Sequence, residues 1–367
     1  MAIDKTGIST GEEIRRIVDA LESSLIVNFR NFFDLKRDVA ITEVDLERWQ
    51  TEQFKKYLTF QKTNRAIIAS YVKPIESAII SDMKDSYAFG IELVTKHLQQ
   101  AQEKGATFRK IAAVAPFEEN RRVQLQVDVI KRRMNEMLNN AYHDLNMRYL
   151  ATVHQVPNMP APTLKTAIDM ANVDFLNAGV SAGRTARGHN LNIVNKFETD
   201  TQEWSQEMLF IGEGEKASEV GNHYVWITIH SSTCPKCSPW QNKVLIDDVY
   251  QDGKPDGVHE LLSTAIREGL FHYNCRHNKI PFIPGVDKIP DKPNYVPKTT
   301  AEQHTLYEKE QKQRYMERQI RMWKRRELGA VSEQERLKAH LKVRQWQARR
   351  TELIEGTKGL YRPQYWR

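Results

Sequence analysis

The sequence predicts a mainly α-helical protein with a helical N-terminal body, one small α+β module and basic C-terminal helices. Apolar residues recur at helical steps over most of the first part of the chain. From about residue 222 the apolar period changes to two, which is typical of strands. Beyond a proline-rich stretch, the pattern is again helical and strongly basic. We therefore predict a helical body over 1–215, a small α+β module over 216–285, a proline-rich linker over 286–299 and a basic helical tail over 300–367.

The bulk composition excludes several classes of protein. The chain has 367 residues, of which 40% are apolar and 28% charged, and its mean hydropathy is −0.61. No run approaches the ~18 consecutive apolar residues of a membrane-spanning helix, and the first residues lack the pattern of a secretory signal. We therefore expect no membrane partner. The three cysteines lie close together, which fits a metal site in a reducing compartment better than a disulfide framework.

The positive charge of the chain is concentrated in one segment. The formal net charge is +7, and residues 308–350 contain fourteen Lys and Arg against six Glu, a net of +8, so the rest of the chain sums to −1. Such a local excess is typical of a tail that faces a polyanion.

The body opens with two predicted helices and continues with a third. Thr10 and Glu13 form a capping box for a helix over 10–32, in which each side chain satisfies a free backbone N–H. Thr42 begins a second helix, and Pro74 is suited to the first turn of a further one. The apolar stripe of the first helix consists of Ile14, Ile17, Val18, Leu21, Leu25, Phe29 and Phe32.

The longest helix is expected over 119–153, with a stripe that indicates the core of a helix bundle. Three prolines between 157 and 162 break the pattern, and Thr163 starts another helix. The segment 179–188 is rich in Gly, Arg and Ser, but it lacks the spacing of a phosphate-binding loop, so we expect a plain turn or loop.

The module is expected to contain strands over 223–229 and 243–246, a turn over 252–257 and a short helix over 258–269. Prolines from 281 to 297 then predict an extended linker. Two helices follow, over 300–327 and 332–354, with a break at Gly329.

The module also carries metal-ligand spacing. A Cys-x-x-Cys turn at Cys234 and Cys237 directs two thiolates toward one ion, and Cys275 is the third expected ligand. The fourth is His277 or His272, with His230 as a weaker alternate. Mixed thiolate and imidazole ligands favour Zn²⁺, and four protein ligands would make the site structural. A metal with one open position, as in a nuclease of the HNH type, and a site with no metal are the alternatives.

The helix over 300–327 has an apolar stripe on one side and basic residues on the other. We expect the basic side to bind the phosphate backbone of DNA without sequence specificity, or to dock on an acidic protein surface. The alternative is that the charges are merely solvated. The candidate binding residues are Arg314, Arg318, Arg321, Lys324, Arg325 and Arg326.

Motifs of the module and of the following helix resemble the phage minor capsid protein 2 family. They include His230-Ser231, Trp240-Gln241, Lys243-Val244, Glu268-Gly269-Leu270, Asn274-Cys275-Arg276-His277, Pro281-Phe282-Ile283-Pro284-Gly285, Tyr307, Gln313-Arg314, Glu317-Arg318, Ile320-Arg321 and Lys324-Arg325. The Cys-x-x-Cys pair departs from this family, whose members tend to have Arg and His there, and is similar to Mu F-like head-morphogenesis proteins.

The resemblance implies a structural, low-copy component of a tailed-phage head near the portal, able to contact packaged DNA. Its partners would be the portal protein, the major capsid protein or both, and it would be located in the virion after passing through the host cytoplasm during assembly. We expect no catalytic residues and no enzymatic activity. The two competing hypotheses are a metal-dependent nuclease built on His230, His272 and His277, and a nonspecific DNA-binding protein.

Overall fold

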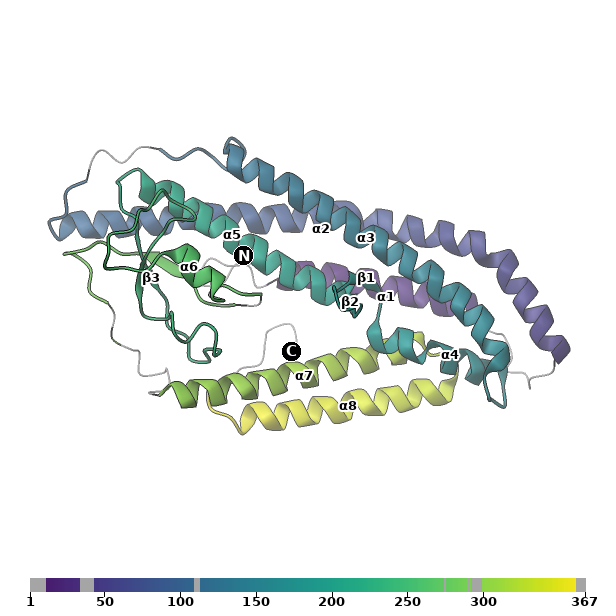
Figure 1. Ribbon diagram of the computed structural model, residues 1–367. Helices are drawn as coiled ribbons and strands as arrows, with labels where there is room; N and C mark the ends of the chain where they lie inside the picture. The colour runs from purple at the N-terminus through teal and green to yellow at the C-terminus, as the bar shows by residue number, and fades with distance from the viewer. Residues whose placement is uncertain are drawn as a thin grey trace.

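The computed structural model describes residues 11–33, 43–108, 113–273, 275–289, 291 and 299–360. Of these residues 67% are helical and 6% are in strands, which confirms the mainly helical prediction. Figure 1 shows long helices packed side by side, a small module with strands at one end of them, and a helical hairpin along one side. Predicted features at Thr10, Thr42 and Asn274, and most of the proline-rich linker, lie outside the described residues.

The first helix, α1 (Glu12–Phe33), follows the predicted pattern. Ile14, Val18, Leu21 and Leu25 are fully buried, and Phe29 is almost so, because they recur on one face. Ile17 and Phe32, at the edges of that face, are partly buried against the same core.

The helix α2 (Glu43–Glu103) corrects two predictions. It runs through Pro74 without a new start, and with 61 residues it is longer than α3 (Arg121–Gln155), which has 35 and was predicted to be the longest. An internal proline costs about 3 kcal/mol because it removes a backbone hydrogen bond and crowds the preceding turn. The residues that follow it, Ile75, Ile79 and Met83, are buried to 1% exposure or less. Their burial offsets the cost of the proline, so tertiary packing carries the helix past it.

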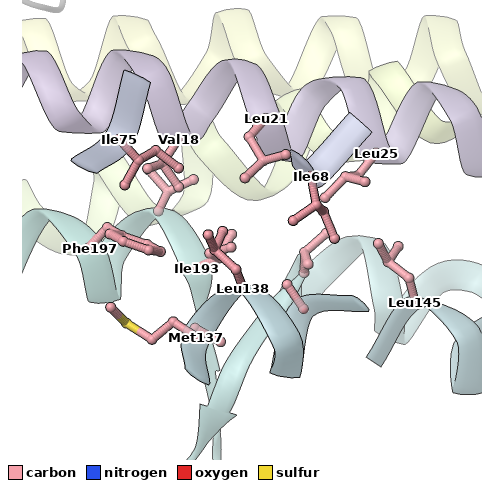
Figure 2. Close-up of a cluster of buried hydrophobic side chains, with 14 of the residues drawn as sticks. Val18, Leu21, Leu25, Ile68, Ile75, Met137, Leu138, Leu145, Ile193 and Phe197 are labelled. Atoms are coloured by element: carbon pink, nitrogen blue, oxygen red, sulfur yellow. The ribbon is translucent and has the colours of Figure 1, made fainter. Parts of the chain in front are cut away.

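The helices α1, α2, α3 and α5 (Ile193–Ser218) share one continuous core. Figure 2 shows side chains from all four meeting there, among them Leu21, Ile75, Leu138 and Phe197. Two glycines let α2 and α5 approach closely. A Cβ at Gly90 would clash with the Leu209 carbonyl, and a Cβ at Gly212 would clash with the Tyr87 carbonyl.

The connection from α3 to α5 follows the predicted breaks. Asn120 caps α3 by accepting from Val123 N at 3.1 Å, a short 3₁₀ turn covers Val156–Asn158, and Thr163 caps α4 (Leu164–Ala178) as predicted. The segment expected to be a plain turn or loop instead forms a small antiparallel ribbon of β1 (Ser181–Arg184) and β2 (Asn190–Asn192).

The module is built on an antiparallel sheet in the order β4-β3-β5. The strands β3 (Tyr224–Ile227) and β4 (Val244–Ile246) lie within the predicted strands, with Val225 and Ile227 buried on one face. The strand β5 (Lys279–Pro281) was not predicted, because its proline was assigned to the linker. It lies at the sheet edge, where a missing N–H is tolerated. The helix α6 (Leu262–Arg267) is shorter than predicted, since a turn occupies its expected start.

The basic helices α7 (Thr300–Gly329) and α8 (Glu333–Glu355) form the hairpin in Figure 1. Thr299 and Glu302 form a capping box at the start of α7, and Ser332 caps α8. Gly329 ends α7 and packs against Leu176 and Ile26 of the body. In the part of the chain that the structure describes, no helix is long and apolar enough to span a membrane.

Candidate metal centre

Two backbone turns bring the three cysteines of the module together. In the first, Ser238 N donates to the Cys234 carbonyl and Trp240 N to the Cys237 carbonyl, each at 3.0 Å. In the second, Cys275 N donates to the His272 carbonyl at 2.7 Å. Each turn places side chains three residues apart on the same side, so the spacing in the sequence becomes a cluster in space.

The ligand atoms form two groups that share one thiol. One group is Cys234, Cys237 and His272, and the other is Cys237, Cys275 and His277, with the ligand atoms of each group all within 4.8 Å of one another. Cys237 Sγ lies 3.5 Å from Cys275 Sγ, which lies 3.5 Å from His277 Nδ1. A tetrahedral zinc centre with ~2.3 Å Zn–S bonds separates its ligand atoms by roughly 3.5–3.8 Å. Two of the three distances in the second group therefore already match the spacing of such a centre.

His272 has the better oriented imidazole of the two candidate histidines. Its Nε2 lies 3.0 Å from Cys234 Sγ, and its Nδ1 lies 2.8 Å from the Tyr273 carbonyl. A carbonyl at one ring nitrogen fixes the tautomer and leaves the other nitrogen to face a metal. His277 is 3% exposed, and its Nε2 has no hydrogen-bond partner among the described residues.

His230 belongs to neither group. Its Nε2 is bonded to the Arg276 carbonyl, and its ring meets that of His277 edge-on with 4.8 Å between centroids. Burial, reinforced by the nearby His277, lowers the pKa of His230 to about 4. A neutral His230 therefore buttresses His277 and the loop beside it.

The two nearest thiols share their protons unequally. The hydrogen bond from Cys237, together with those from His277, lowers the pKa of Cys275 below its usual range although burial opposes the shift. The same bond and burial raise the pKa of Cys237 well above its usual range. A thiolate is thus favoured at Cys275, and thiolates are the form that binds metal.

The thiols lie inside the small core of the module. Cys234 and Cys237 are 7% and 1% exposed. The buried apolar residues packed with them are Val225, Ile227, Trp240, Leu245, Leu262, Ala265 and Leu270. So small a core provides little stability by itself, and a bound metal commonly supplements such cores. Both groups consist of Cys and His alone, a ligand set suited to soft transition metals.

The first half of α7 holds the loop that carries the candidate ligands. Gln303 Nε2 donates to the His230 carbonyl at 2.9 Å, Gln241 Nε2 donates to Gln303 Oε1 at 3.1 Å, and Ser232 Oγ donates to Glu310 Oε1 at 2.7 Å. No sequence pattern predicted these contacts, because they join polar residues from distant segments.

The predicted basic binding residues divide into two sets. At the end of α7, Arg325 donates to the carbonyls of Leu176 and Asn177 at 3.1 and 2.7 Å, and Arg326 pairs with Glu335 at 3.1 Å. These two guanidinium groups thus hold the fold together. Arg314 and Arg321 are half-buried and line a cleft together with the exposed Arg318, while Lys324 is exposed.

Comparison with known proteins gives one match. The family model described as phage minor capsid protein 2 matches residues 13–355. No curated protein and no solved structure matches the chain. The match confirms the resemblance seen in the motifs of the module and extends it to the body and to both basic helices.

Proposed function

The chain belongs to the phage minor capsid protein 2 family, and from this premise we propose that it is a low-copy structural protein of a tailed-phage head, located near the portal. Membership of the family makes it a phage minor capsid protein. Its position near the portal, its binding to portal or major capsid protein, its contact with packaged DNA and its passage through the host cytoplasm are parts of the proposal.

The observation that carries the proposal is the extent of the match. Residues 13–355 include the helical body, the module and both basic helices, so the family describes the whole architecture. The segregation of charge supports a role between protein and nucleic acid, since the segment 308–350 is +8 and the rest of the chain sums to −1.

The location is tested by mass spectrometry of purified heads and head precursors. We expect the chain in both, at a small fraction of the major capsid protein, and crosslinked to the portal after treatment with an amine-reactive reagent. Absence from both kinds of particle would overturn the proposal. Presence without portal crosslinks, but with crosslinks spread over the major capsid protein, would contradict the portal location alone.

For the metal we propose a structural Zn²⁺ bound by Cys234, Cys237 and Cys275, with His277 or His272 as the fourth ligand. The 3.5 Å spacing of the ligand atoms and the Cys and His chemistry support zinc. When bound, the ion would join the two turns of the module and add its binding free energy to folding.

We propose no enzymatic role, and a metal-dependent nuclease is the alternative. Incubation of the purified protein with DNA and Mg²⁺ or Mn²⁺ separates the two. Cleavage that is lost in His272→Ala or His277→Ala would favour the nuclease. The structural proposal expects intact DNA in every case.

A further inference from the structure

A cavity of about 650 Å³ lies where α7 faces the body and the module. Its walls come from segments far apart in the sequence: the start of α1, the end of α4, β2, the first turns of α5, the loop that follows α6, and the middle of α7. Contacts of α7 with the module at one end and with the body at the other define this space. We call it the basic cleft.

The lining of the basic cleft is strongly cationic. Its three acids are each engaged: Glu198 pairs with Arg15 at 3.2 Å, Glu310 accepts from Ser232, and Glu317 accepts from Gln313 at 3.0 Å. The seven lining cations are Arg15, Lys196, Arg276, Arg314, Arg318, Arg321 and Arg325. Two of these cations meet acids just outside the lining, since Lys196 pairs with Asp200 and Arg325 lies 3.8 Å from Glu22. Seven cations against these five acids leave the cleft a net charge of +2, and its low-dielectric walls focus the resulting positive potential.

The excess of positive charge in the cleft disfavours the charged form of Arg314. It is half-buried in the wall, and burial, followed by the neighbouring Arg276, lowers its pKa. On α7, Arg325 and Arg326 pair with Glu22 and Glu335, whereas Arg314 and Arg318 form no ion pair with a described residue. An anion between Arg314 and Arg276 would offset both the burial and the repulsion.

The arginines on α7 are spaced for a polyanion. Arg314, Arg318 and Arg321 lie on one face, and a helical rise of 1.5 Å per residue sets them roughly 4.5–6 Å apart along the axis. Successive phosphates of an extended strand are separated by about the same distance. Guanidinium groups bind phosphates in bidentate fashion.

Two exposed aromatic rings in the lining distinguish a nucleic acid from an acidic peptide. Tyr273 and Tyr315 are 51% and 46% exposed, and each has a cation 6.0 Å from its ring centroid, Lys196 and Arg318 respectively. Exposed rings within a basic groove are the stacking surfaces that single-stranded nucleic acids use. An acidic peptide would need apolar pockets for anchor side chains, and only Ala178, Leu191, Met322 and Leu360 in the lining are aliphatic or thioether residues.

We propose that the basic cleft binds a single-stranded polynucleotide, with its phosphates on Arg314 and Arg318 and a base stacked on Tyr273 or Tyr315. The volume is that of a small ligand pocket, so it admits a few nucleotides of one strand and not the body of a duplex. This proposal specifies how the DNA contact proposed above would be made, and its biological role rests on that proposed function. The binding itself is a property of the purified protein and can be tested on it.

Fluorescence anisotropy with a labelled oligo(dT) and the full chain tests the proposal. The variant R314Q/R318Q should weaken binding at least tenfold and flatten the salt dependence, because each lost phosphate contact removes roughly 0.7 from the slope of log affinity against log salt. The control K342Q/R344Q removes the same charge from α8, outside the cleft, and should change affinity less than twofold. Of Y273A and Y315A, each at an exposed ring, at least one should weaken binding roughly tenfold through lost stacking.

Three outcomes would overturn the proposal. They are no binding of oligo(dT) at low salt, equal losses in the cleft and control variants, or stronger competition by poly-Glu than by unlabelled oligo(dT). A duplex of the same length should bind more weakly than oligo(dT). If it binds as tightly, and if Y273A does not weaken that binding, the outer face of the helices and not the cleft would be the binding surface, which would also contradict the proposal. None of these outcomes depends on whether the chain is found in phage heads, so the two proposals fail independently.

Discussion

Lys279 is the cation of a charge cluster buried between the body and the module. Its ammonium lies 3.2 Å from Glu213 Oε2 and 3.0 Å from Asp247 Oδ2, and all three side chains are at most 1% exposed. These are contacts at ion-pair distance rather than aligned hydrogen bonds. Burial raises the pKa of Glu213 to about 7; Lys279 opposes the shift, and the nearby Asp247 carboxylate adds to it.

Lys279→Met should destabilise the protein by about 3–5 kcal/mol, because it leaves two carboxylates buried without a cation. Glu213→Gln should cost less than about 1 kcal/mol, since it removes the surplus charge and keeps the pair of Lys279 with Asp247. Urea unfolding at pH 8 measures both free energies. Similar losses in the two variants would show that the cluster does not carry surplus negative charge.

Stability should also depend on pH through Glu213. Its folded pKa of about 7 lies above the ordinary value of 4.5, so the folded state binds a proton more tightly than the unfolded state. The contribution of Glu213 is therefore fully present below pH 4.5 and is lost as the pH rises through 7. Between these values the wild type should lose stability relative to Glu213→Gln, as compared by urea unfolding across the range. Parallel pH curves would contradict this assignment.

The metal ligands give a prediction at single positions. Protein purified without added zinc should contain about one equivalent of it, and Cys275→Ser should contain almost none, because every four-ligand set includes that thiolate. Of His272→Gln and His277→Gln, only one should lose the metal. His223→Gln is the matched control, since this module histidine lies outside both ligand groups and contacts Gln251 instead. Full metal content in Cys275→Ser would refute the site.

Among the described elements, α2 and α5 share the most extensive contact. Their contact depends on Gly90 and Gly212, where an added Cβ would meet backbone atoms of the opposite helix rather than a flexible side chain. The backbone cannot yield without moving a whole helix. Close approach at these two points therefore sets the distance between the layers of the body.

Gly212→Ala should destabilise the body by about 1–3 kcal/mol, despite the higher helix propensity of alanine, because the methyl group forces α2 and α5 apart. Gln99→Ala, at an exposed position of α2, is the control and should be neutral or slightly stabilising. Thermal unfolding followed by circular dichroism compares them. A Gly212→Ala variant as stable as the control would show that the helices separate at little cost.

Element starts were predictable where a local side chain makes the cap. Thr163 begins α4 because its hydroxyl accepts from the next turn, and such contacts depend only on neighbours in the sequence. The unbroken course of α2 through Pro74 and the edge strand β5 were not predictable in this way. The first depends on burial by other helices, and the second on a partner strand about fifty residues away.

At the scale of the whole molecule, α7 connects the parts. Its first half bonds to the loop around His230, and Arg325 near its end bonds to the carbonyls of α4 and lies 3.8 Å from Glu22 of α1. The sequence predicts a separate tail over 300–367, and that boundary remains a prediction. The contacts show that α7 packs on both the body and the module.

Removal of the metal should therefore lower the local stability of the module and of the first turns of α7, but not that of the whole molecule. After treatment with a chelator, hydrogen exchange should speed up in the module and in the first turns of α7, which bond to it, while α1 and α3 keep their protection. Exchange measured by mass spectrometry resolves these regions. Uniform loss of protection would mean that the whole chain unfolds as one unit, and no change would mean that metal does not stabilise the module.

The sequence by itself determined the helical class, the strands β3 and β4, the family and the cluster of Cys and His, because periodicity, caps and short ligand spacings act over a few residues. The tertiary structure alone decided that Lys279 lies between two acids, that Arg325 is used inside the fold and that Arg314 faces a cleft. Each of these depends on which distant segment lies opposite a side chain. Such pairings follow from how the elements pack. An apolar stripe on a helix shows that another element covers it, but it does not show which one.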